Sequence, residues 1–364
     1  MTFLRRRLTL SIVVVLLVAL GIPAIWLGIK WNRTLSNVDK MIVPTVALPS
    51  ATAGARTSSA AALGAEPGSG DQAAIDTAPT AIPDLDGVQN ILLVGTDARP
   101  GEDISRTDAL VWVRLDPSNN RVSMLSFPRD LYVRIPGYGK DKINAAYPIG
   151  EKKIGPGYGP ALLKETVGQL VGMPIDRFVM INFEGFQTII DKIGGIYIDV
   201  PKAIDDDKYP LDEYEGDIRT TKIHFDSGLQ LMDGARALMY ARTRHADSDF
   251  GRNQRQQQVL MAIFDRIRAQ GLLTQLTSLD DYTAILSDYI RTDITRGEML
   301  SLASMGSQLH AESIQRFAID PKMVVAERQP AYVLVLKDQK SLRRLVNQMI
   351  DPTVASAGGE EPTR

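Results

Sequence analysis

The sequence predicts an α/β fold in which a mixed central sheet is flanked by helices on both faces and preceded by one transmembrane helix. Short apolar runs typical of strands alternate with helical stretches along the chain. The turn sequence Pro-Ser-Asn-Asn at 117–120 separates two of these runs and indicates an antiparallel hairpin, which a purely parallel sheet would lack. A long uncharged run lies near the N-terminus.

That uncharged run, at 8–29, follows Arg5, Arg6 and Arg7. As a helix it is long enough to cross a hydrocarbon core of about 30 Å. The arginines favour a cytoplasmic location for residues 1–7, so we expect a single-pass cell-membrane protein with an extracytoplasmic domain. A cleaved signal peptide is the alternative, but the nearest Ala-x-Ala pattern, at 51–53, lies far beyond the run.

Composition divides the rest of the chain. Residues 30–87, rich in Ala, Gly, Ser, Thr and Pro towards their end, are predicted to form a flexible extracytoplasmic linker. Residues 88–351 are predicted to form one folded domain, and residues 352–364 a disordered tail. The chain of 364 residues has a net charge of −2 and no cysteine, which excludes disulfides, thiolate catalysis and a global attraction to nucleic acid.

Within the domain, strands and helices follow from local pattern. Apolar or β-branched runs predict the strands. They lie at 90–95, 108–116, 121–127, 178–183 and 196–200, with 332–336 as an edge strand. Helices are expected at 161–171, 184–193, 252–268 and 296–309. In the third helix, Leu260, Ile263, Phe264 and Ile267 form a stripe that packs on the core.

Charged residues gather at the ends of the first strands. Asp97 follows one strand and Asp108 opens the next, so a short return would bring both carboxylates to one sheet edge, with Arg99 and Arg106 between them. Two close carboxylates favour a divalent cation or an arginine as partner. Alternatively, each aspartate is a turn residue satisfied by backbone N–H groups. Arg129 follows Phe-Pro on a stiff turn, either at a site or in a surface ion pair.

Two later clusters add cations and amides. Lys142 and Asn144 would share one side of an extended segment, or lie in a solvated loop. Arg242 and Arg244 would likewise share a side if extended. Asp249 is placed to cap the next helix, whose first turns carry Arg252, Arg255 and Gln256.

Arginines at a helix N-terminus oppose the helix dipole, so their presence favours a bound anion over a solvated charged face. Phosphoryl transfer needs mainly positioning and charge stabilisation, which such residues supply. The residues alone therefore predict an extracellular, membrane-tethered enzyme or binder that acts on a phosphate or pyrophosphate.

An ordered set of motifs carries a resemblance to a known family. The set comprises NILLVGTDAR, RTDAL, SFPRDLYV, KINAAY, IGGIYIDVP, LMDGARALMYARTRH and SDFGRNQRQQQVL. With these motifs the sequence resembles the LytR-CpsA-Psr family of bacterial cell-envelope proteins. The resemblance covers about 88–267 and continues more weakly to 351.

The resemblance implies transfer of a glycopolymer from a polyprenyl-pyrophosphate carrier to a peptidoglycan hydroxyl, with Mg²⁺ or Mn²⁺ assisting and the prenyl chain in an apolar pocket. It implies Asp97 and Asp108 as metal ligands, and it leaves open which of them is the general base. The catalytic residues expected are Asp97, Asp108, Arg129, Arg244 and Arg252. The substrate-binding residues expected are Arg99, Arg106, Lys142, Asn144, Arg242, Asp249, Arg255 and Gln256.

The chain departs from the family pattern behind KINAAY, where a loop rich in Gly and Pro at 150–159 replaces the usual paired glycines, so the glycopolymer is not carried over. Two other functions stay open, a pyrophosphatase that uses water as acceptor and a non-catalytic membrane-bound envelope regulator. No nucleic-acid partner is expected, because the chain lacks a basic recognition helix followed by a dimerisation element.

Overall fold

The computed structural model describes residues 36–49, 87–97, 107–211, 219–244, 247–270, 287–308, 313–328 and 331–351. The predicted cytoplasmic residues 1–7, the transmembrane run 8–29 and the tail 352–364 lie outside these ranges. Within them, no helix combines the length and the apolar character needed to cross a bilayer.

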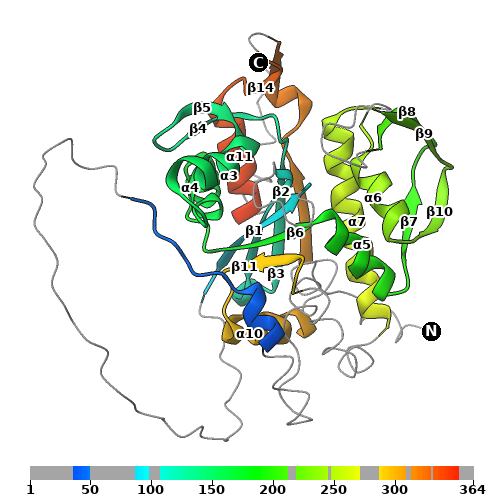
Figure 1. Cartoon of the computed structure of the whole chain (residues 1–364), viewed down its shortest axis with the longest axis horizontal. Coiled ribbons are helices and arrows are strands. Elements are labelled where there is room, and N and C mark those ends of the chain that lie inside the picture. Colours follow the sequence, from blue (N-terminus) through cyan, green and yellow to red (C-terminus); the bar gives the residue numbers. More distant parts are fainter. Residues whose placement is uncertain are drawn as a thin grey trace, which may run out of the picture.

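The central sheet has six strands in the order β11-β6-β1-β2-β3-β12 (Figure 1). Its strands are β1 (Gln89–Thr96), β2 (Thr107–Asp116), β3 (Arg121–Phe127), β6 (Arg177–Asn182), β11 (Ile290–Thr292) and β12 (Ile314–Ala318). β1 pairs with β6 and β3 pairs with β12 in parallel, whereas the other pairs are antiparallel. The predicted mixed sheet is therefore confirmed.

The predicted hairpin joins β2 to β3 through a 3₁₀ turn, η1 (Pro117–Asn119). The Asp116 carboxylate accepts a hydrogen bond from the Asn119 N–H at 3.1 Å. Asn120 then adopts a left-handed conformation with φ 47°, which asparagine tolerates better than most residues. The turn follows from local side-chain chemistry, which explains why the sequence predicts it.

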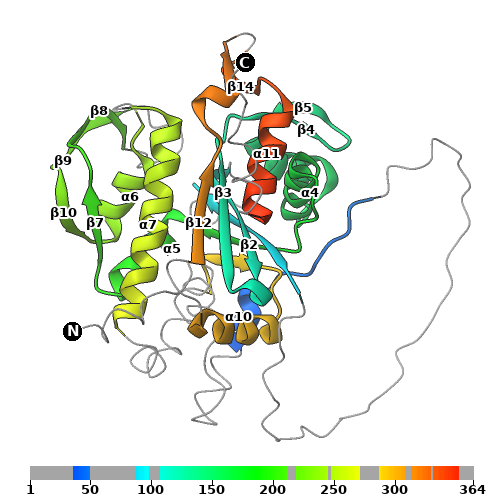
Figure 2. The ribbon, with the colours of Figure 1, turned by 180° about the vertical axis from the view of Figure 1, so that it is seen from behind.

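Helices cover both faces of the sheet (Figures 1 and 2). On one side lie α3 (Ala146–Ile149), α4 (Gly159–Val171) and α11 (Gln339–Ile350). On the other lie α5 (Phe183–Lys192), α6 (Gly234–Arg242) and α7 (Asp249–Ala269). Because successive strand residues point to opposite faces, Ile91 joins one core and Leu92 the other. Both faces are buried, so the strands read as continuous apolar runs.

Smaller two-stranded sheets surround this core. They pair β4 (Tyr132–Ile135) with β5 (Gly139–Lys142), β7 (Ile196–Val200) with β10 (Gly228–Met232), β8 (Ile204–Pro210) with β9 (Thr220–Phe225), and β13 (Val324–Glu327) with β14 (Val333–Leu336). The strands predicted at 196–200 and 332–336 exist, but they belong to these small sheets. β7 buries every second residue, the pattern of a strand with one covered face.

The remaining elements are α10 (Arg296–Gln308), the 3₁₀ turns η2 (Ile143–Ala145) and η5 (Pro321–Met323), and the π-helical η3 (Gly150–Ile154). The four predicted helices are confirmed within a few residues as α4, α5, α7 and α10. In α7, Ile263, Phe264 and Ile267 are buried as predicted.

Residues 36–49 correct the predicted linker at 30–87. Residues 36–41 are helical, and Val38 and Met41 are buried in the core beside α10 (Figure 1). The Val43 N–H donates to the Thr292 carbonyl at 2.8 Å, which attaches the segment to β11. The prediction was wrong here because it weighed the composition after Pro44 and overlooked the apolar residues before it.

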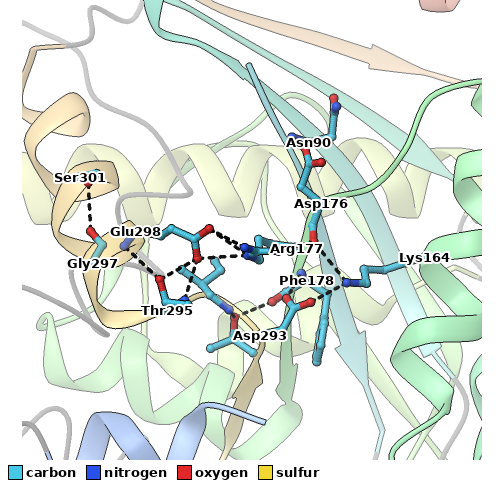
Figure 3. A network of polar contacts seen from close by, with 12 residues as sticks. Asn90, Lys164, Asp176, Arg177, Phe178, Asp293, Thr295, Gly297, Glu298 and Ser301 are labelled. Carbon is cyan, nitrogen blue, oxygen red and sulfur yellow. Dashed lines mark hydrogen bonds and ion pairs between the residues drawn. The ribbon is translucent and has the colours of Figure 1, made fainter. Parts of the chain in front are cut away.

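A network of buried and half-buried ion pairs fixes the amino ends of β1 and β6 (Figure 3). Lys164 Nζ lies 2.5 Å from Asp293 Oδ2, and Asp293 Oδ1 accepts the Phe178 N–H at 2.7 Å. Beside this pair, the Arg177 Nη2 donates to Glu298 Oε1 at 2.6 Å. The network joins α4, β6, β11 and α10, and it leaves the opposite, carboxyl end of β1 and β6 for the site.

Candidate functional site

A cavity of about 320 Å³ lies between the central sheet and helices α5, α6 and α7. Much of its wall is aliphatic or aromatic. These side chains include Leu93, Val111, Val179, Ile181, Phe183, Phe186, Ile189, Leu238, Val259, Leu260 and Ile263. Its polar lining is formed by Asp97, Asp108, Arg129, Asn182, Arg242, Arg244, Arg252 and Gln256. The cavity thus combines an apolar slot with clustered arginines and two carboxylates.

The two carboxylates come from adjacent strand ends, as the sequence predicts. Gly95 pairs with Ala109 and Thr96 pairs with Thr107, so Asp108 is the extra residue of a bulge. Asp97 directly follows Thr96 and therefore lies at the same edge of the sheet. Both side chains line the cavity. The predicted Arg99 and Arg106 fall between them, outside the described residues.

Arg129 reaches the cavity from the turn after β3. Its Nη1 donates to Asp108 Oδ1 at 2.5 Å. Burial acts to lower the pKa of Arg129, but the charge and hydrogen bond of Asp108, together with the charges of Asp249 and Asp130, outweigh burial and raise this pKa overall. Arg129 therefore stays charged inside the protein and holds one oxygen of Asp108.

Lys142 and Asn144 contact Arg129 and its neighbour Asp130 outside the cavity. Lys142 Nζ donates to Asp130 Oδ1 at 2.6 Å, and Asp130 Oδ2 lies 3.7 Å from Arg129 Nε. The Asn144 N–H donates to the Arg129 carbonyl at 3.3 Å. Neither Lys142 nor Asn144 lines the cavity, because the segment turns into η2 and does not continue as a strand. Asp130 connects Lys142 to Arg129, and the sequence had offered an ion pair at Arg129 only as the alternative to a site.

Arg242 and Arg244 both line the cavity, but the extended segment predicted for them is wrong. Arg242 ends helix α6, whose Ala237, Leu238 and Ala241 are buried. The Arg242 guanidinium lies 4.5 Å from the centre of the Phe183 ring, which orients it.

Asp206, on β8, fixes the turn that carries Arg244. Thr243 Oγ1 donates to Asp206 Oδ2 at 2.5 Å, and the Arg244 N–H donates to the same oxygen at 3.3 Å. Asp206 is 1% exposed. Sequence reasoning missed this residue, because it stands within an unremarkable run of three aspartates.

The N-terminus of α7 contributes Arg252. Ser248, and not Asp249 as predicted, caps the helix by accepting from the Gly251 N–H. Asp249 occupies the first turn, where a negative charge favours the helix dipole, and its Oδ1 lies 3.3 Å from Arg252 Nη2. Asp249 is thus a partner of an arginine and not part of the cavity wall.

Arg252 is the most unusual charge of the site. It is 3% exposed, and its Nε and Nη2 make no hydrogen bond. Burial lowers the pKa of Arg252, the positive charge of Arg129 lowers it further, and Asp249 offsets only part of this. A buried guanidinium with idle donors is costly to leave unpaired, so its environment favours a bound anion.

The side chains of Arg255 and Gln256 have different surroundings, and only Gln256 lines the cavity. Arg255 donates to the Tyr240 carbonyl at 3.1 Å and to Asp247 Oδ2 at 2.6 Å, so it braces the turn between α6 and α7. A Cβ at Gly251 would come within 2.0 Å of the Asp247 carboxylate, so a larger residue there would force this side chain to move. The structure does not bring Arg255 to the cavity, whereas Gln256 does line it.

Asp97 and Asp108 are the carboxylates in the cavity lining that could bind a metal ion. Among the described residues, no three Asp, Glu or His side chains gather at one point. Asp97 and Asp108 are nevertheless hard oxygen donors on one cavity wall. Mg²⁺ commonly binds one or two carboxylates and takes its other ligands from water and substrate phosphates. The two aspartates therefore fit a cation that arrives with a phosphate ligand.

Comparison with known proteins now identifies the family. The family model described as LytR_cpsA_psr family matches residues 55–351. The chain belongs to the LytR-CpsA-Psr family. This confirms the resemblance inferred from the ordered motifs, and the match begins earlier than the predicted domain boundary at 88.

Curated relatives in this family carry specific names. The chain is 36% identical over 216 residues to the polyisoprenyl-teichoic acid–peptidoglycan teichoic acid transferase TagU of Oceanobacillus iheyensis, which covers 58% of this chain and 61% of the relative. It is 33% identical over 236 residues to TagT of Bacillus subtilis, covering 64% of this chain and 68% of the relative. The chain thus spans about three fifths of the first of these relatives.

Solved structures of family members share the fold. The crystal structure of B. subtilis TagV has 30% identity and a TM-score of 0.56, and covers 73% of this chain and 98% of its own. A structure of TagT bound to LI-WTA has 26% identity and a TM-score of 0.54, and covers 74% of this chain and 93% of its own. The mixed α/β architecture of this LytR-CpsA-Psr protein is therefore that of its relatives.

Proposed function

We propose that this protein transfers a glycopolymer phosphate from a polyprenyl-pyrophosphate carrier to a peptidoglycan sugar hydroxyl, forming a phosphodiester link in the cell wall. The observation that carries this proposal is one cavity that joins an apolar slot to the buried, incompletely paired guanidinium of Arg252. The names of the curated relatives, as teichoic acid transferases acting on peptidoglycan, support the same reaction.

The two parts of the cavity match the two parts of such a donor. The aliphatic and aromatic lining, between the sheet and α5, α6 and α7, suits a prenyl chain, whose transfer from water is favourable. Arg129, Arg244 and Arg252 suit the pyrophosphate, because guanidinium groups form paired, charge-assisted hydrogen bonds with phosphate oxygens. Arg242 and Gln256 line the same cavity and provide further donors.

The reaction is a displacement at the phosphorus that carries the glycopolymer. The oxygen of the acceptor hydroxyl forms a bond to this phosphorus, and the bond from the phosphorus to the bridging oxygen breaks. Polyprenyl phosphate leaves with the electron pair of that bond. The hydroxyl proton passes to a carboxylate, for which Asp97 and Asp108 are the candidates that line the cavity.

The fixed arginines stabilise the charge that develops on the phosphate oxygens, and they are held in place before substrate arrives. Asp206 holds the turn of Arg244, Asp130 lies against Arg129, and Arg255 braces the turn before α7. Asp97 and Asp108 would hold Mg²⁺ or Mn²⁺, which would neutralise phosphate charge when bound.

The same proposal places the protein at the membrane. A polyprenyl carrier resides in the bilayer, and the uncharged run at 8–29 has the length of a membrane anchor behind three arginines. We therefore propose a single-pass cell-membrane protein with a cytoplasmic N-terminus and an extracytoplasmic catalytic domain.

A direct assay tests the function. The full-length chain, purified in detergent, is mixed with a short-chain prenyl-pyrophosphoryl sugar, magnesium and peptidoglycan oligomers, and mass spectrometry follows the products. We expect a sugar phosphate joined to the oligomer, with release of prenyl phosphate. Release without the adduct would indicate a pyrophosphatase. Absence of turnover with tight pyrophosphate binding would indicate a non-catalytic regulator.

A matched pair of variants makes the assay specific. Arg252→Met removes the buried guanidinium and should abolish most turnover. Gln169→Ala changes an exposed side chain of α4, whose Nε2 donates to Glu165, and should leave turnover unchanged.

A further inference from the structure

A second hollow lies on the side of α7 that faces away from the cavity. This groove, of about 580 Å³, runs between the first turns of α7 and the end of β12 with the residues after it. Figure 2 shows α7 beside β12 on this side of the molecule. The two hollows share one helix. Arg252 and Gln256 line the cavity, whereas Asn253 and Gln257 line the groove.

The groove has different chemistry from the cavity. Four side-chain amides line it, from Asn253, Gln254, Gln257 and Gln258. Each amide both donates and accepts hydrogen bonds, which is the property of a sugar hydroxyl as well. The rings of Phe250 and Phe317 also line the groove, and its charged residues, Arg316 and Asp320, are of opposite sign. This lining suits an uncharged, hydroxyl-rich ligand and offers no surplus of positive charge for a phosphate.

One of these amides is buried and incompletely paired. Asn253 is 2% exposed, and its Nδ2 has no hydrogen-bond partner. The neighbouring amides are engaged, since Gln257 Nε2 donates to Ser126 Oγ and to the Phe317 carbonyl, both at 2.7 Å. Gln258 Oε1 accepts from the Tyr240 hydroxyl at 2.8 Å. A buried N–H donor without an acceptor costs free energy, and a ligand oxygen would recover it.

We propose that this groove is a binding site for the neutral sugar rings of a glycan. Ligand hydroxyls or carbonyls pair with the amides of Asn253 and Gln254, and the apolar faces of the rings pack against Phe250 and Phe317. The proposal deepens the proposed function, on which it rests for the identity of the glycan. Both substrates contain sugars, so the ligand is either the peptidoglycan acceptor strand or the glycopolymer of the donor.

The position of the groove suits either source. Asn253 is the next residue after Arg252, so groove and phosphate site are separated by the width of one helix, about 10–12 Å with side chains. A glycan of a few rings that lies in the groove can therefore continue around the first turn of α7 towards the cavity.

Binding tests the site without any turnover. Chitotetraose, a neutral oligosaccharide, is titrated into the full-length protein in detergent by calorimetry. We expect binding in the parent and about tenfold weaker binding in Asn253→Leu, which removes the amide but keeps its branched shape. Gln254→Ala, at an exposed position, should weaken binding by a smaller factor, and Gln169→Ala on α4 should not change it. An unchanged dissociation constant in both groove variants, or no binding by the parent, would overturn the proposal.

Steady-state kinetics separates the two sources. If the groove holds the acceptor, Asn253→Leu raises the KM for peptidoglycan oligomers and leaves the KM for the donor unchanged. A raised donor KM with an unchanged acceptor KM assigns the groove to the donor glycopolymer, and either result upholds the site. Thermal unfolding checks that each variant is folded, and Gln254→Ala serves if Asn253→Leu is not. If chitotetraose binding depends on Asn253 but the protein has no transferase activity, the proposed function is contradicted and the binding site in the groove is still supported.

Discussion

At the amino ends of β1 and β6, buried and half-buried ionised side chains are paired with one another. Lys164 lies 2.5 Å from Asp293, whose second oxygen accepts a backbone N–H, and Arg177 forms a bidentate contact with Glu298 (Figure 3). At the carboxyl ends of the same strands, Arg252 is buried at least as deeply, yet its Nε and Nη2 make no hydrogen bond.

The difference separates stability from function within one sheet. A buried charge that is fully paired stabilises one arrangement of the elements around it, whereas a charge without full pairing destabilises the fold until a ligand completes it. At the carboxyl end of the sheet, the incompletely paired guanidinium of Arg252 therefore favours the binding of an anion. The amino end supplies the rigidity that keeps this site in place.

The largest expected effect comes from removing the incompletely paired charge of Arg252. Arg252→Met should lower the transfer rate by about a hundredfold or more, the scale of losing one charge-stabilising donor. Its free energy of unfolding should not fall, because an incompletely paired buried charge destabilises the fold and methionine removes that cost. Product formation by mass spectrometry and urea unfolding measure the two effects.

Arg255→Met, one turn further along α7, is the matched control. Arg255 is fully engaged with Asp247 and with the Tyr240 carbonyl, so its loss should lower the free energy of unfolding by about 2–3 kcal/mol. A folded Arg252→Met protein with near-parental transfer would remove Arg252 from the site.

The next effect tests the paired end of the sheet. Lys164→Met should lower the free energy of unfolding by about 2–3 kcal/mol, because it leaves the Asp293 carboxylate buried without its cation. Transfer by the protein that remains folded should be unchanged. Urea unfolding measures the loss, and the double variant with Asp293→Asn should recover part of it, since asparagine can still accept the Phe178 N–H. Equal losses in the single and double variants would contradict the pairing.

Much of this architecture could be predicted from the sequence. The apolar runs of β1 and β3 and the turn at 117–120 are local signals, and the structure confirms them. Asp97 and Asp108 were also predictable as neighbours, because a short return between two strand ends leaves few other arrangements. Their position on one cavity wall follows from the register of β1 and β2.

What the sequence does not show depends on contacts between distant segments. Lys164 and Asp293 are 129 positions apart, and neither stands in a recognisable motif. Asp206 fixes the turn at Arg244 from a separate small sheet. Arg252 and Arg255 both lie in the first turns of α7. Only their contacts in the structure show that Arg255 binds Asp247 whereas Arg252 lines the cavity.

A smaller effect concerns the carboxylates of the cavity. Asp97→Asn should raise the magnesium concentration for half-maximal transfer by about tenfold, because a neutral amide binds a hard cation more weakly than a carboxylate. A chelator should lower transfer in the parent, and magnesium should restore it. Asp207→Asn, at an exposed aspartate of β8 that pairs with Lys222, provides the control and should respond like the parent. If Asp97→Asn also responds like the parent, Asp97 is not a metal ligand.

The smallest effect sharpens the comparison through pH. Burial acts to raise the pKa of Glu298, but hydrogen bonds from Arg177 and Thr295 outweigh burial and lower this pKa below its ordinary value of 4.5. The unfolded chain therefore binds the proton more readily than the folded one, and the contribution of Glu298 is fully present above pH 4.5 and lost as the pH falls through the folded value.

Relative to the parent, Glu298→Gln should thus lose stability at neutral pH, by less than about 1 kcal/mol because the pair is partly exposed. The difference should shrink below pH 4.5, as measured by urea unfolding at a series of pH values. A difference that does not vary with pH would show that the loss comes from packing and not from the charge of Glu298. The difference in stability between Arg252→Met and the parent should not follow the titration of Glu298, because both proteins contain Glu298 and Arg252 stays protonated over this range.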